Sequence, residues 1–529
     1  MKGGPQGSRG LTLGATAAVA LALLPIVGLG LAWLAPPALF APPPLTMARL
    51  LPLVARTLAL ALVVATGSAL IGTWIAWVGA MTTYRGRRWL TLCALLPLAV
   101  PSYVLATVTR EVLAPEGVIG KVLGLEGAAT GFWPAAWVLT LACTPYVQLI
   151  VSATLARIPA AELEAARGLG ATPSRRFRAV ILPRLRPAWA LSSLIVILYV
   201  VADFGAVAIL DCEVLTWELY KASGSKDAVV IAFATMACVV PLVAGVRLLH
   251  GRTVEEVGAL RAPLPRAPLD AKGMALTWGL HGLLIGWGAL LPTVMLTVWV
   301  IGGLRHDVTF APLAASAGWT ALYATLGATL TVALAMAPAW LSARGRSKMS
   351  AWVSHGVHLT SSLPGVLVGV GLLHLILALK RIAPLGGLEL WAGMEAAGVF
   401  LLLAYAMRFL AMAHDALEPV VTRLDPRLSE AARVLGADRT RRLREVELPQ
   451  ILPGIRAAWI LIFLAIAKEL PLTLLLTPLG QHTLAYRLFD AQQEGSTPDV
   501  GLAGLVLLAM AGLMFFLVHL TPRKRRDHA

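Results

Sequence analysis

The chain has 529 residues, of which 58% are hydrophobic and 14% are charged. Soluble globular domains carry roughly 25% charged residues, so this composition excludes an ordinary soluble protein. Apolar stretches long enough to cross a bilayer, which takes roughly 20 helical residues, recur along the whole chain. We therefore predict an all-α membrane protein.

We predict about twelve membrane-spanning helices, six in each half of the chain. Their expected ranges are 13–34, 57–80, 89–109, 133–155, 188–210, 228–249, 279–303, 315–341, 352–379, 394–414, 455–477 and 500–520. The first range follows Lys2 and Arg9 and could be mistaken for a signal peptide. Its apolar run is longer than the roughly 7 to 15 residues of a signal-peptide core, so we keep it as a span.

Proline and glycine interrupt two spans at corresponding places. The third span opens with LLPLAVPSYVLA, and its counterpart in the second half is SSLPGVLVGVGL, around Pro364. Such residues leave backbone carbonyls free and allow bends where the helix packs against protein or lines a cavity. We expect at each place either a tolerated kink or a break that lines a transport pathway.

One segment of the sequence occurs twice. Glu164–Pro183 reads EAARGLGATPSRRFRAVILP and Glu430–Pro449 reads EAARVLGADRTRRLREVELP; aligned without a gap, they agree at 13 of 20 positions. The chain is therefore a duplication. We divide it into a first half at 1–250, a basic, proline-rich linker at 251–277 and a second half at 278–529.

Each copy predicts a short helix outside the membrane. Proline at Pro159 and Pro426 suits a first helical turn, and Asp425 can cap it. Gly170 and Gly436 can take the left-handed conformation that ends a helix. The second copy also has one narrow apolar face at helical spacing, formed by Leu424, Leu428, Ala431 and Leu435. A short, arginine-rich helix of this kind is a docking surface.

An acidic residue lies inside the span that follows each copy. Asp203 in VVADFGAVAIL and Glu469 in AIAKELPLTLLL are related by the same shift that takes Glu164 to Glu430. Ionisable groups at such depth cost roughly 2.5 to 3.5 kcal/mol each and usually face a bundle interior or a cavity. One interpretation is structural: Lys468 pairs with Asp203 between the halves, or the acids cap bends at Gly205 and Pro471. The other is functional, with both acids lining a translocation path for a cationic solute.

The charges are distributed as in a polytopic membrane protein. With the N-terminus in the cytoplasm, and with Arg247 and Glu395 at the ends of their spans counted with the adjoining segments, the cytoplasmic segments hold 31 of the 44 Lys and Arg residues and 13 of the 28 acids. The outer segments hold 10 basic and 13 acidic residues. This is the positive-inside asymmetry. Both termini and both repeated segments then face the cytoplasm. A nucleic-acid partner is not needed to explain the net charge of +16.

The repeated pattern of Glu-Ala-Ala, three residues, Gly and a later Leu-Pro resembles the cytoplasmic coupling loop in permease subunits of binding-protein-dependent ABC importers. The resemblance implies two pseudo-symmetric halves of the type I (MetI-like) permease fold in a bacterial inner membrane, with coupling loops at 156–187 and 422–454. It implies two ATPase subunits on the cytoplasmic side and a solute-binding protein outside. The residues expected to couple to the ATPases are Glu164, Ala165, Ala166, Gly170, Pro183, Glu430, Ala431, Ala432, Gly436 and Pro449.

The spans after the loops narrow the resemblance. ADFGAVAIL with the later Leu219-Tyr220, and KELPLTLLL with HTLAYRLF, resemble segments of fused ferric-iron permeases. The resemblance implies ferric iron as the substrate and a path near Asp203, Glu469 and Lys468. Thiamine, phosphonate and polyamine are the alternatives for the same architecture. The outer loops are short and hold no clustered tyrosines or His, Asp and Glu ligands, so we expect no metal site on this chain.

The sequence also lacks catalytic motifs. No GxxxxGK[ST] occurs, so we expect no cofactor on this chain and place ATP and Mg in the partner ATPase. The four cysteines have no CxxC spacing and are expected to be packing residues. The histidines lack HExxH spacing and are expected to be hydrogen-bonded residues of the bundle, with His355 and His358 the pair of most interest; the set is His281, His355, His358, His374 and His414.

Two other functional classes stay open. An ion-coupled secondary transporter can also have twelve spans, repeated halves and intramembrane acids. It gives no reason, however, for two matching docking loops. A membrane-embedded enzyme is disfavoured because the sequence has no polar catalytic cluster. We therefore expect a transport subunit that is not itself an enzyme and that contacts lipid along its spans.

Overall fold

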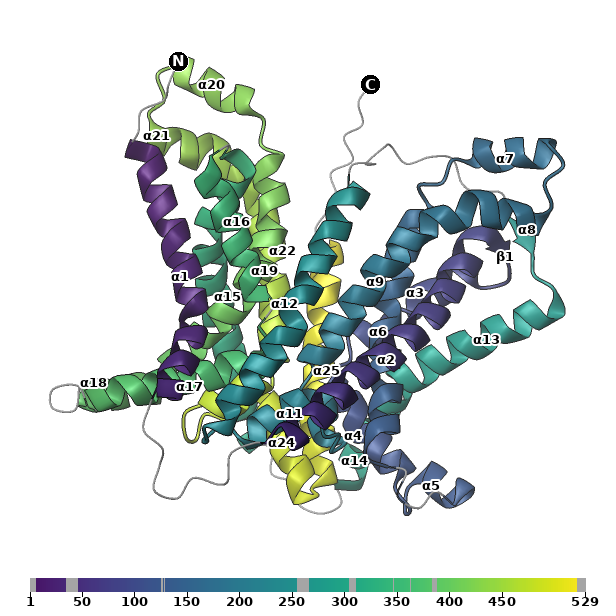
Figure 1. Cartoon of the computed structure of the whole chain (residues 1–529), viewed down its shortest axis with the longest axis horizontal. Helices are drawn as coiled ribbons and strands as arrows, with labels where there is room; N and C mark the ends of the chain where they lie inside the picture. The colour runs from purple at the N-terminus through teal and green to yellow at the C-terminus, as the bar shows by residue number, and fades with distance from the viewer. Residues whose placement is uncertain are drawn as a thin grey trace. The chain divides into compact units, whose positions relative to one another are not determined.

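The computed structural model describes residues 6–34, 46–124, 127, 129–254, 266–303, 311–345, 347–361, 363–382 and 388–520. These residues are almost entirely helical (Figure 1). The strands among them are two-residue segments, β1 (Thr82–Thr83) and β2 (Ala267–Pro268), which pair in parallel. The prediction of an all-α protein is confirmed, with this small pairing as its one exception in the part described.

The chain forms two compact units, each containing one copy of the repeat. The first-repeat unit comprises Pro43–Ala222 and Val230–His306. The second-repeat unit comprises Met1–Pro42, Ser223–Val229 and Asp307–Ala529.

The first-repeat unit has a core of three long helices, α2, α6 and α9, which pack against one another. Apolar residues cover their contacting faces. Because lipid tails are as apolar as these side chains, the helices are held together by close packing and not by exclusion of water. Its elements are α2 (Met47–Met81), α3 (Arg87–Cys93), η1 (Leu96–Leu98), α4 (Ser102–Leu113), α5 (Val118–Leu123), α6 (Phe132–Leu155), α7 (Ala160–Gly168), α8 (Pro173–Arg176), η2 (Phe177–Ile181), α9 (Leu182–Ala202), α10 (Gly205–Ile209), α11 (Leu215–Lys221), most of α12 (Asp227–Val254), α13 (Ala271–Ile285), η3 (Gly286–Leu290) and α14 (Leu291–Gly303).

The second-repeat unit repeats this core with α15, α19 and α22. Its elements are α1 (Gln6–Leu34), α15 (Ala311–Arg344), α16 (Lys348–Ser361), α17 (Gly365–Ile382), α18 (Leu388–Ala396), α19 (Val399–Thr422), α20 (Pro426–Val434), α21 (Arg439–Arg441), η4 (Arg442–Glu447), α22 (Leu448–Ala467), α23 (Pro471–Leu476), α24 (Leu484–Glu494) and α25 (Thr497–Leu520).

The first helix of each half packs in the unit of the other half. Helix α1 lies along α15, α16 and α17 in the second-repeat unit (Figure 1). A Cβ added at Gly28 would lie 1.9 Å from the Gly371 carbonyl oxygen, so glycine permits this close approach. Helices α13 and α14 pack on α2 and α4, where Trp287 Nε1 donates to Thr109 Oγ1 at 3.1 Å. The halves at 1–250 and 278–529 thus describe the repeat in the sequence, whereas the compact units exchange these first helices.

Each of the twelve predicted spans overlaps a helical segment. Among the described residues, nine helices are long and apolar enough to cross a membrane, and two bent pairs add one span each if counted so. The twelfth range overlaps a shorter apolar helix, Thr497–Leu513. Within the predicted linker at 251–277, α12 ends at Val254 and α13 begins at Ala271.

The third and ninth predicted spans bend at the predicted prolines. Arg87–Leu98 and Ser102–Val122 meet at 94°, and the second pair, Lys348–Thr360 and Gly365–Lys380, meets at 99°. Helices α4 and α17 begin directly after Pro101 and Pro364, as expected for a residue that cannot donate a helical hydrogen bond. The interruption of these spans is confirmed.

The predicted bounds of the fifth and eleventh spans are wrong at their outer ends. Helix α9 ends at Ala202 and α22 ends at Ala467, and the short helices α10 and α23 follow after a break. The predictions continued each span to 210 and 477. The breaks fall at the two acids, which take non-helical or irregular backbone positions there.

The packing of α1 can be tested by cross-linking. An ideal Cβ at Gly356 on α16 would lie 3.6 Å from the Val19 Cβ, which is within the roughly 3.5–4.5 Å typical of disulfides. We expect Val19→Cys with Gly356→Cys, in a chain without native cysteines, to form a disulfide on oxidation. After proteolysis at a site inserted between 255 and 265, the two fragments should migrate together on a gel until they are reduced.

The matched control is Val19→Cys with Gly393→Cys, because a Cβ at Gly393 has no neighbour within 4 Å. Fragments of this variant should separate. If the Val19 and Gly356 pair also gave separate fragments, α1 would not lie on α16.

Candidate functional site

The first coupling loop consists of a docking helix, α7, and a turn that returns the chain to the membrane. The turn places Gly170 at φ +75°. The Ala171 N–H donates to the Ala166 carbonyl at 3.0 Å, which closes the C-terminus of the helix in a Schellman arrangement. Thr172 then caps α8 through its hydroxyl, which accepts from Arg175 N–H at 3.3 Å. The predicted left-handed glycine is confirmed.

The second coupling loop repeats this geometry at the equivalent positions. The Asp425 side chain caps α20 by accepting from Arg427 N–H at 2.9 Å, as predicted. Gly436 has φ +83°, and the Ala437 N–H donates to the Ala432 carbonyl at 3.0 Å. Asp438 caps the next helix as Thr172 does in the first copy. Both docking helices therefore end in the same glycine turn.

The two docking helices share part of the surface that they expose. Leu169 and its repeat-equivalent Leu435 have exposed fractions of 88% and 86%. Glu164 and Glu430 are exposed on the same helices, and the described residues give neither carboxylate a hydrogen bond or ion pair. Two of the residues expected to couple, Ala166 and Ala432, are half-buried. The acids and the turn glycines of that set are exposed: Glu164, Glu430, Gly170 and Gly436. An exposed leucine and an exposed acid on each docking helix are therefore available to a partner.

The two docking helices are held to their own chain by different contacts. In the first copy Leu163 and Ile181 are buried, and Arg184 forms an ion pair with Glu162 at 2.6 Å. In the second copy the positions equivalent to Leu163 and Ile181 are Ser429 and Glu447, whose side chains form a hydrogen bond of 2.8 Å. No residue of α20 is buried. The loops thus share an exposed leucine and the glycine turn, and they differ in the contacts that hold them to their own unit.

Each coupling loop continues without interruption into a membrane helix. The run from Ser174 to Ala202 is 29 residues, and the run from Arg442 to Ala467 is 26 residues. At 1.5 Å per residue these rods are about 44 and 39 Å long. Each contains a π-helical segment at the repeat-equivalent place, η2 and η4. Figure 1 shows α7 and α20 beyond the ends of α9 and α22, each in its own unit.

The first rod ends at Asp203, which is 9% exposed. Its Oδ1 accepts from the Ala206 N–H at 3.0 Å and its Oδ2 accepts from the Ser102 hydroxyl at 2.7 Å. Its carbonyl accepts from the Thr216 hydroxyl at 2.7 Å. Asp203 therefore caps α10 and joins it to the start of α4. A Cβ at Gly205 would lie 2.9 Å from the Tyr103 Cβ, so the two short helices approach closely.

The second rod ends at Glu469, which is 8% exposed. Its Oε2 accepts from the Leu472 N–H at 2.9 Å, and its carbonyl accepts from the Thr473 hydroxyl at 2.7 Å. A Cβ at Gly365, the first residue of α17, would lie 2.7 Å from Glu469 Oε1. Glu469 thus caps α23 against the second bent pair, as Asp203 does in the first unit. The predicted capping of bends at Gly205 and Pro471 is confirmed.

Sequence reasoning missed several partners of these acids. Ser102, Thr216 and Thr473 are single hydroxyl residues inside apolar sequence, and only the fold brings them to the carboxylates and carbonyls. Lys468 is exposed in its unit, and the described part of the chain offers it no ion pair within that unit. The pairing of Lys468 with Asp203, which lie in different units, stays a prediction.

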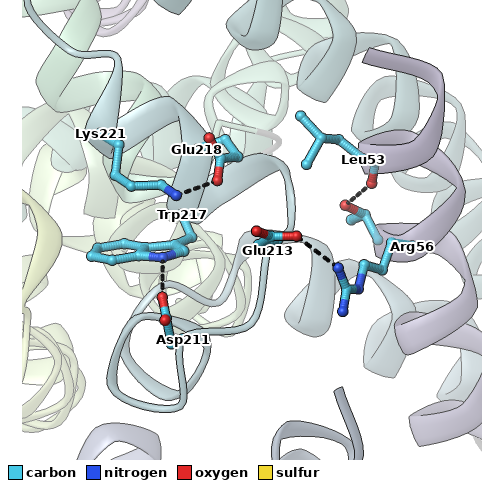
Figure 2. A network of polar contacts seen from close by, with 8 residues as sticks. Leu53, Arg56, Asp211, Glu213, Trp217, Glu218 and Lys221 are labelled. Atoms are coloured by element: carbon cyan, nitrogen blue, oxygen red, sulfur yellow. Dashed lines mark hydrogen bonds and ion pairs between the residues drawn. The ribbon is translucent and has the colours of Figure 1, made fainter. Parts of the chain in front are cut away.

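A second shared contact fixes the short helix that follows each broken span. In the first-repeat unit, the Thr57 hydroxyl donates to the Leu53 carbonyl at 2.7 Å and accepts from the Leu215 N–H at 3.1 Å. Beside it Arg56 forms an ion pair with Glu213 at 2.8 Å (Figure 2). These contacts hold the start of α11 to α2.

The second-repeat unit has the same threonine contact without the ion pair. The Thr320 hydroxyl donates to the Ser316 carbonyl at 2.7 Å and accepts from the Leu484 N–H at 2.8 Å, which holds α24 to α15. The ungapped repeat does not reveal this equivalence, because the shift from Thr57 to Thr320 differs from the shift that relates the coupling loops. In the first unit alone, Trp217 Nε1 also donates to Asp211 Oδ1 at 3.1 Å (Figure 2).

Known proteins match this chain across both units. The family described as "Binding-protein-dependent transport system inner membrane component" matches residues 68–254 and 329–526. The chain is 26% identical over 482 residues to the Fe(3+)-transport system permease protein FbpB 2 of Haemophilus influenzae, which covers 89% of this chain and 90% of that protein.

Shorter relatives match parts of the chain. The putative 2-aminoethylphosphonate transport system permease protein PhnV of Salmonella typhimurium is 27% identical over 203 residues, 37% of this chain and 72% of its own. The putrescine transport system permease protein PotI of Escherichia coli is 25% identical over 225 residues, 42% of this chain and 75% of its own.

The capping role of Asp203 predicts different effects for two substitutions. Asp203→Ala leaves the Ala206 N–H and the Ser102 hydroxyl without their acceptor, so we expect a loss of about 1–3 kcal/mol in the free energy of unfolding. Asp203→Asn keeps an acceptor for Ala206 and gains an amide that can donate to Ser102. We expect it to cost less than about 1 kcal/mol. Thermal unfolding in detergent measures both, and equal stability of the two variants would contradict the capping role.

Proposed function

The chain belongs to the family of binding-protein-dependent transport system inner membrane components, and from this premise we propose how its two units import a solute. It is a fused permease of an ABC importer, a multi-pass protein of the inner membrane that carries two permease domains in one chain. Partners of such a permease are an ATPase and a solute-binding protein.

We propose that two ATPase subunits bind, one at α7 and one at α20. The observation that carries this proposal is the repeated exposure of one leucine, Leu169 or Leu435, and one glutamate, Glu164 or Glu430, on each docking helix. The positive-inside charge pattern supports a cytoplasmic position for both loops and both termini. The binding protein then meets the opposite face, and ATP with its Mg is bound by the partners.

The continuous rods give a route for mechanical coupling. A push on α7 would pass through the glycine turn into the helical run Ser174–Ala202, which ends at Asp203, and a push on α20 would pass into Arg442–Ala467, which ends just before Glu469. Packed helices transmit displacement because protein interiors are close to incompressible. We propose that closure of the ATPase pair moves both rods, and that the bent pairs joined to them by the acids move with the rods.

We propose that the solute passes near Asp203, Glu469 and Lys468. The acids lie at the breaks of their spans, where irregular backbone is tolerated only against protein or a cavity. Both carboxylates also serve as caps, so their structural role and a role in the path are compatible. A negative charge at the path favours a cationic solute.

The substrate proposed is ferric iron. The relative that matches nearly the whole chain is named as an Fe(3+) permease, and it matches both domains together. Phosphonate and polyamine permeases match only parts of the chain, and they are the alternatives with thiamine. The acids at the breaks favour a cation over a phosphonate.

We predict that replacing the turn glycines impairs coupling only through backbone strain, because a larger residue there meets no steric clash. At Gly170 and Gly436 an added Cβ would have no neighbour within 4 Å, so a substitution costs only the left-handed backbone, about 1–2 kcal/mol for each residue. We expect Gly170→Val with Gly436→Val to insert normally and to reduce ATP-driven uptake at least tenfold, because each docking helix loses its closing turn. Uptake into proteoliposomes measures this.

Gly168→Val is the matched control. A Cβ there also meets nothing within 4 Å, its φ is helical, and the second copy has Val434 at the equivalent position. This variant should transport at nearly the wild-type rate. Full uptake by the double glycine variant would refute the role of the turns.

Uptake of radiolabelled ferric iron into proteoliposomes that contain the chain, its ATPase and its binding protein tests the substrate. We expect uptake to require ATP and to persist when the proton gradient is abolished, whereas a secondary transporter would stop. Asp203→Asn and Glu469→Gln should lower uptake without weakening ATPase binding, since they remove charge and keep most of each cap. ATPase stimulation by the binding protein without iron uptake would retain the permease and reject iron.

A further inference from the structure

Two histidines and an aspartate meet between α16 and α19, although sequence reasoning paired His358 with His355 instead. The His358 Nδ1 lies 3.4 Å from Asp415 Oδ1, and the His414 Nδ1 lies 3.1 Å from the same oxygen. All three potential ligand atoms lie within 4.8 Å of one another. The rings of His358 and His414 meet edge to face, with centroids 5.2 Å apart. The prediction of no metal site on this chain did not include this group, because His358 lies far in sequence from His414 and Asp415.

These distances suit ligands of one metal ion. Metal–nitrogen and metal–oxygen bonds of about 2.0–2.2 Å in a tetrahedral site place neighbouring ligand atoms roughly 3.3–3.6 Å apart, and an octahedral site brings them to roughly 3.0 Å. The 3.4 Å between His358 and Asp415 is longer than the usual N–H···O range of about 2.7–3.2 Å. A hydrogen bond alone therefore explains the contact of His414 better than that of His358.

The surroundings fit a metal site as well. The His414 Nε2 lies 3.1 Å from the Ser342 hydroxyl, and such a contact at the second ring nitrogen commonly orients a metal-ligating histidine. The His414 side chain is fully buried, while those of His358 and Asp415 are 20% and 55% exposed, so protein atoms leave one side of the group uncovered. Two imidazoles and one carboxylate select a divalent transition metal such as Fe²⁺, Co²⁺ or Zn²⁺ over Mg²⁺ or Ca²⁺.

The position of the group connects it to the second coupling loop. Asp415 and His414 lie on α19, which ends at Thr422, and α20 begins at Pro426. Val421 and Leu424 pack with Ile451 of α22 below that junction. An ion between α16 and α19 would hold the two helices together at the base of the docking helix.

We propose that His358, His414 and Asp415 form a binding site for a divalent transition-metal ion, and that occupancy slows transport by fixing α19 against α16. The regulatory part rests on the proposed cytoplasmic position of the second coupling loop. It would let accumulated metal ion on the inner side reduce further import.

Titration with Co²⁺ tests the site on the purified full chain in detergent, with any polyhistidine tag removed. Co²⁺ bound by histidine and carboxylate gives visible absorption bands that free Co²⁺ lacks at that intensity. We expect one Co²⁺ per chain, and at least tenfold weaker binding in His358→Gln and in Asp415→Asn. These positions are partly exposed, so the variants should fold; unchanged thermal unfolding without metal verifies this.

His374→Gln is the matched control, because this histidine of α17 is half-buried and its Nδ1 contacts the Val370 carbonyl of its own helix. It should bind Co²⁺ as the wild type does. Absence of the bands in the wild type, or equal bands in Asp415→Asn, would overturn the site. This measurement needs neither ATPase nor substrate, so it can succeed where the proposed iron transport fails.

Uptake into proteoliposomes loaded inside with Co²⁺ tests the regulation. We expect the wild-type rate to fall at least twofold relative to vesicles loaded with a chelator. Asp415→Asn should lose this difference, which also separates the effect from any action of Co²⁺ on the ATPase. An equal fall in both proteins would overturn the regulatory role.

Discussion

A helix that ends inside a membrane exposes backbone groups that lipid cannot satisfy, and this constraint shapes both units. Helices α9 and α22 end within their spans, and the acid that follows each one accepts from a free N–H group of the next short helix. Each carboxylate also meets the start of a bent pair's second helix, through Ser102 in one unit and beside Gly365 in the other. The hydrogen bonds that each carboxylate accepts at the break thus offset the free-energy cost of burying the acid.

The same breaks give the chain its mechanical layout. Between the docking turn and the acid, each unit has one continuous helical rod. Beyond the acid, the next helices are short and are separated by non-helical segments. In the proposed mechanism, displacement applied at the turn is delivered where the bundle is least regular. The threonine contacts of Thr57 and Thr320 hold the next helix to the long core helix, so the short segment between is anchored on both sides. Movement can then concentrate at the acid.

The sequence predicted what depends on local chemistry and on the repeat. The docking helices, their left-handed glycines, the bends at Pro101 and Pro364 and the places of the spans all follow from residue type and spacing. The exchange of first helices could not be predicted, since it depends on the approach of Gly28 to Gly371, which lie in opposite halves of the sequence. The threonine contacts fall outside the ungapped alignment, and the group around Asp415 joins two helices that no motif relates.

The two copies of the coupling loop differ in an instructive way. Some residues that face outward match, namely Leu169 with Leu435 and the turn glycines with each other. Residues that face their own unit do not, since buried Leu163 corresponds to Ser429, which bonds to Glu447. Contacts within a unit can be replaced by others of similar strength, because both partners lie in one chain. The exposed leucine and the glycine turn that the two copies share are the features on which the proposed binding of an ATPase subunit at each docking helix rests.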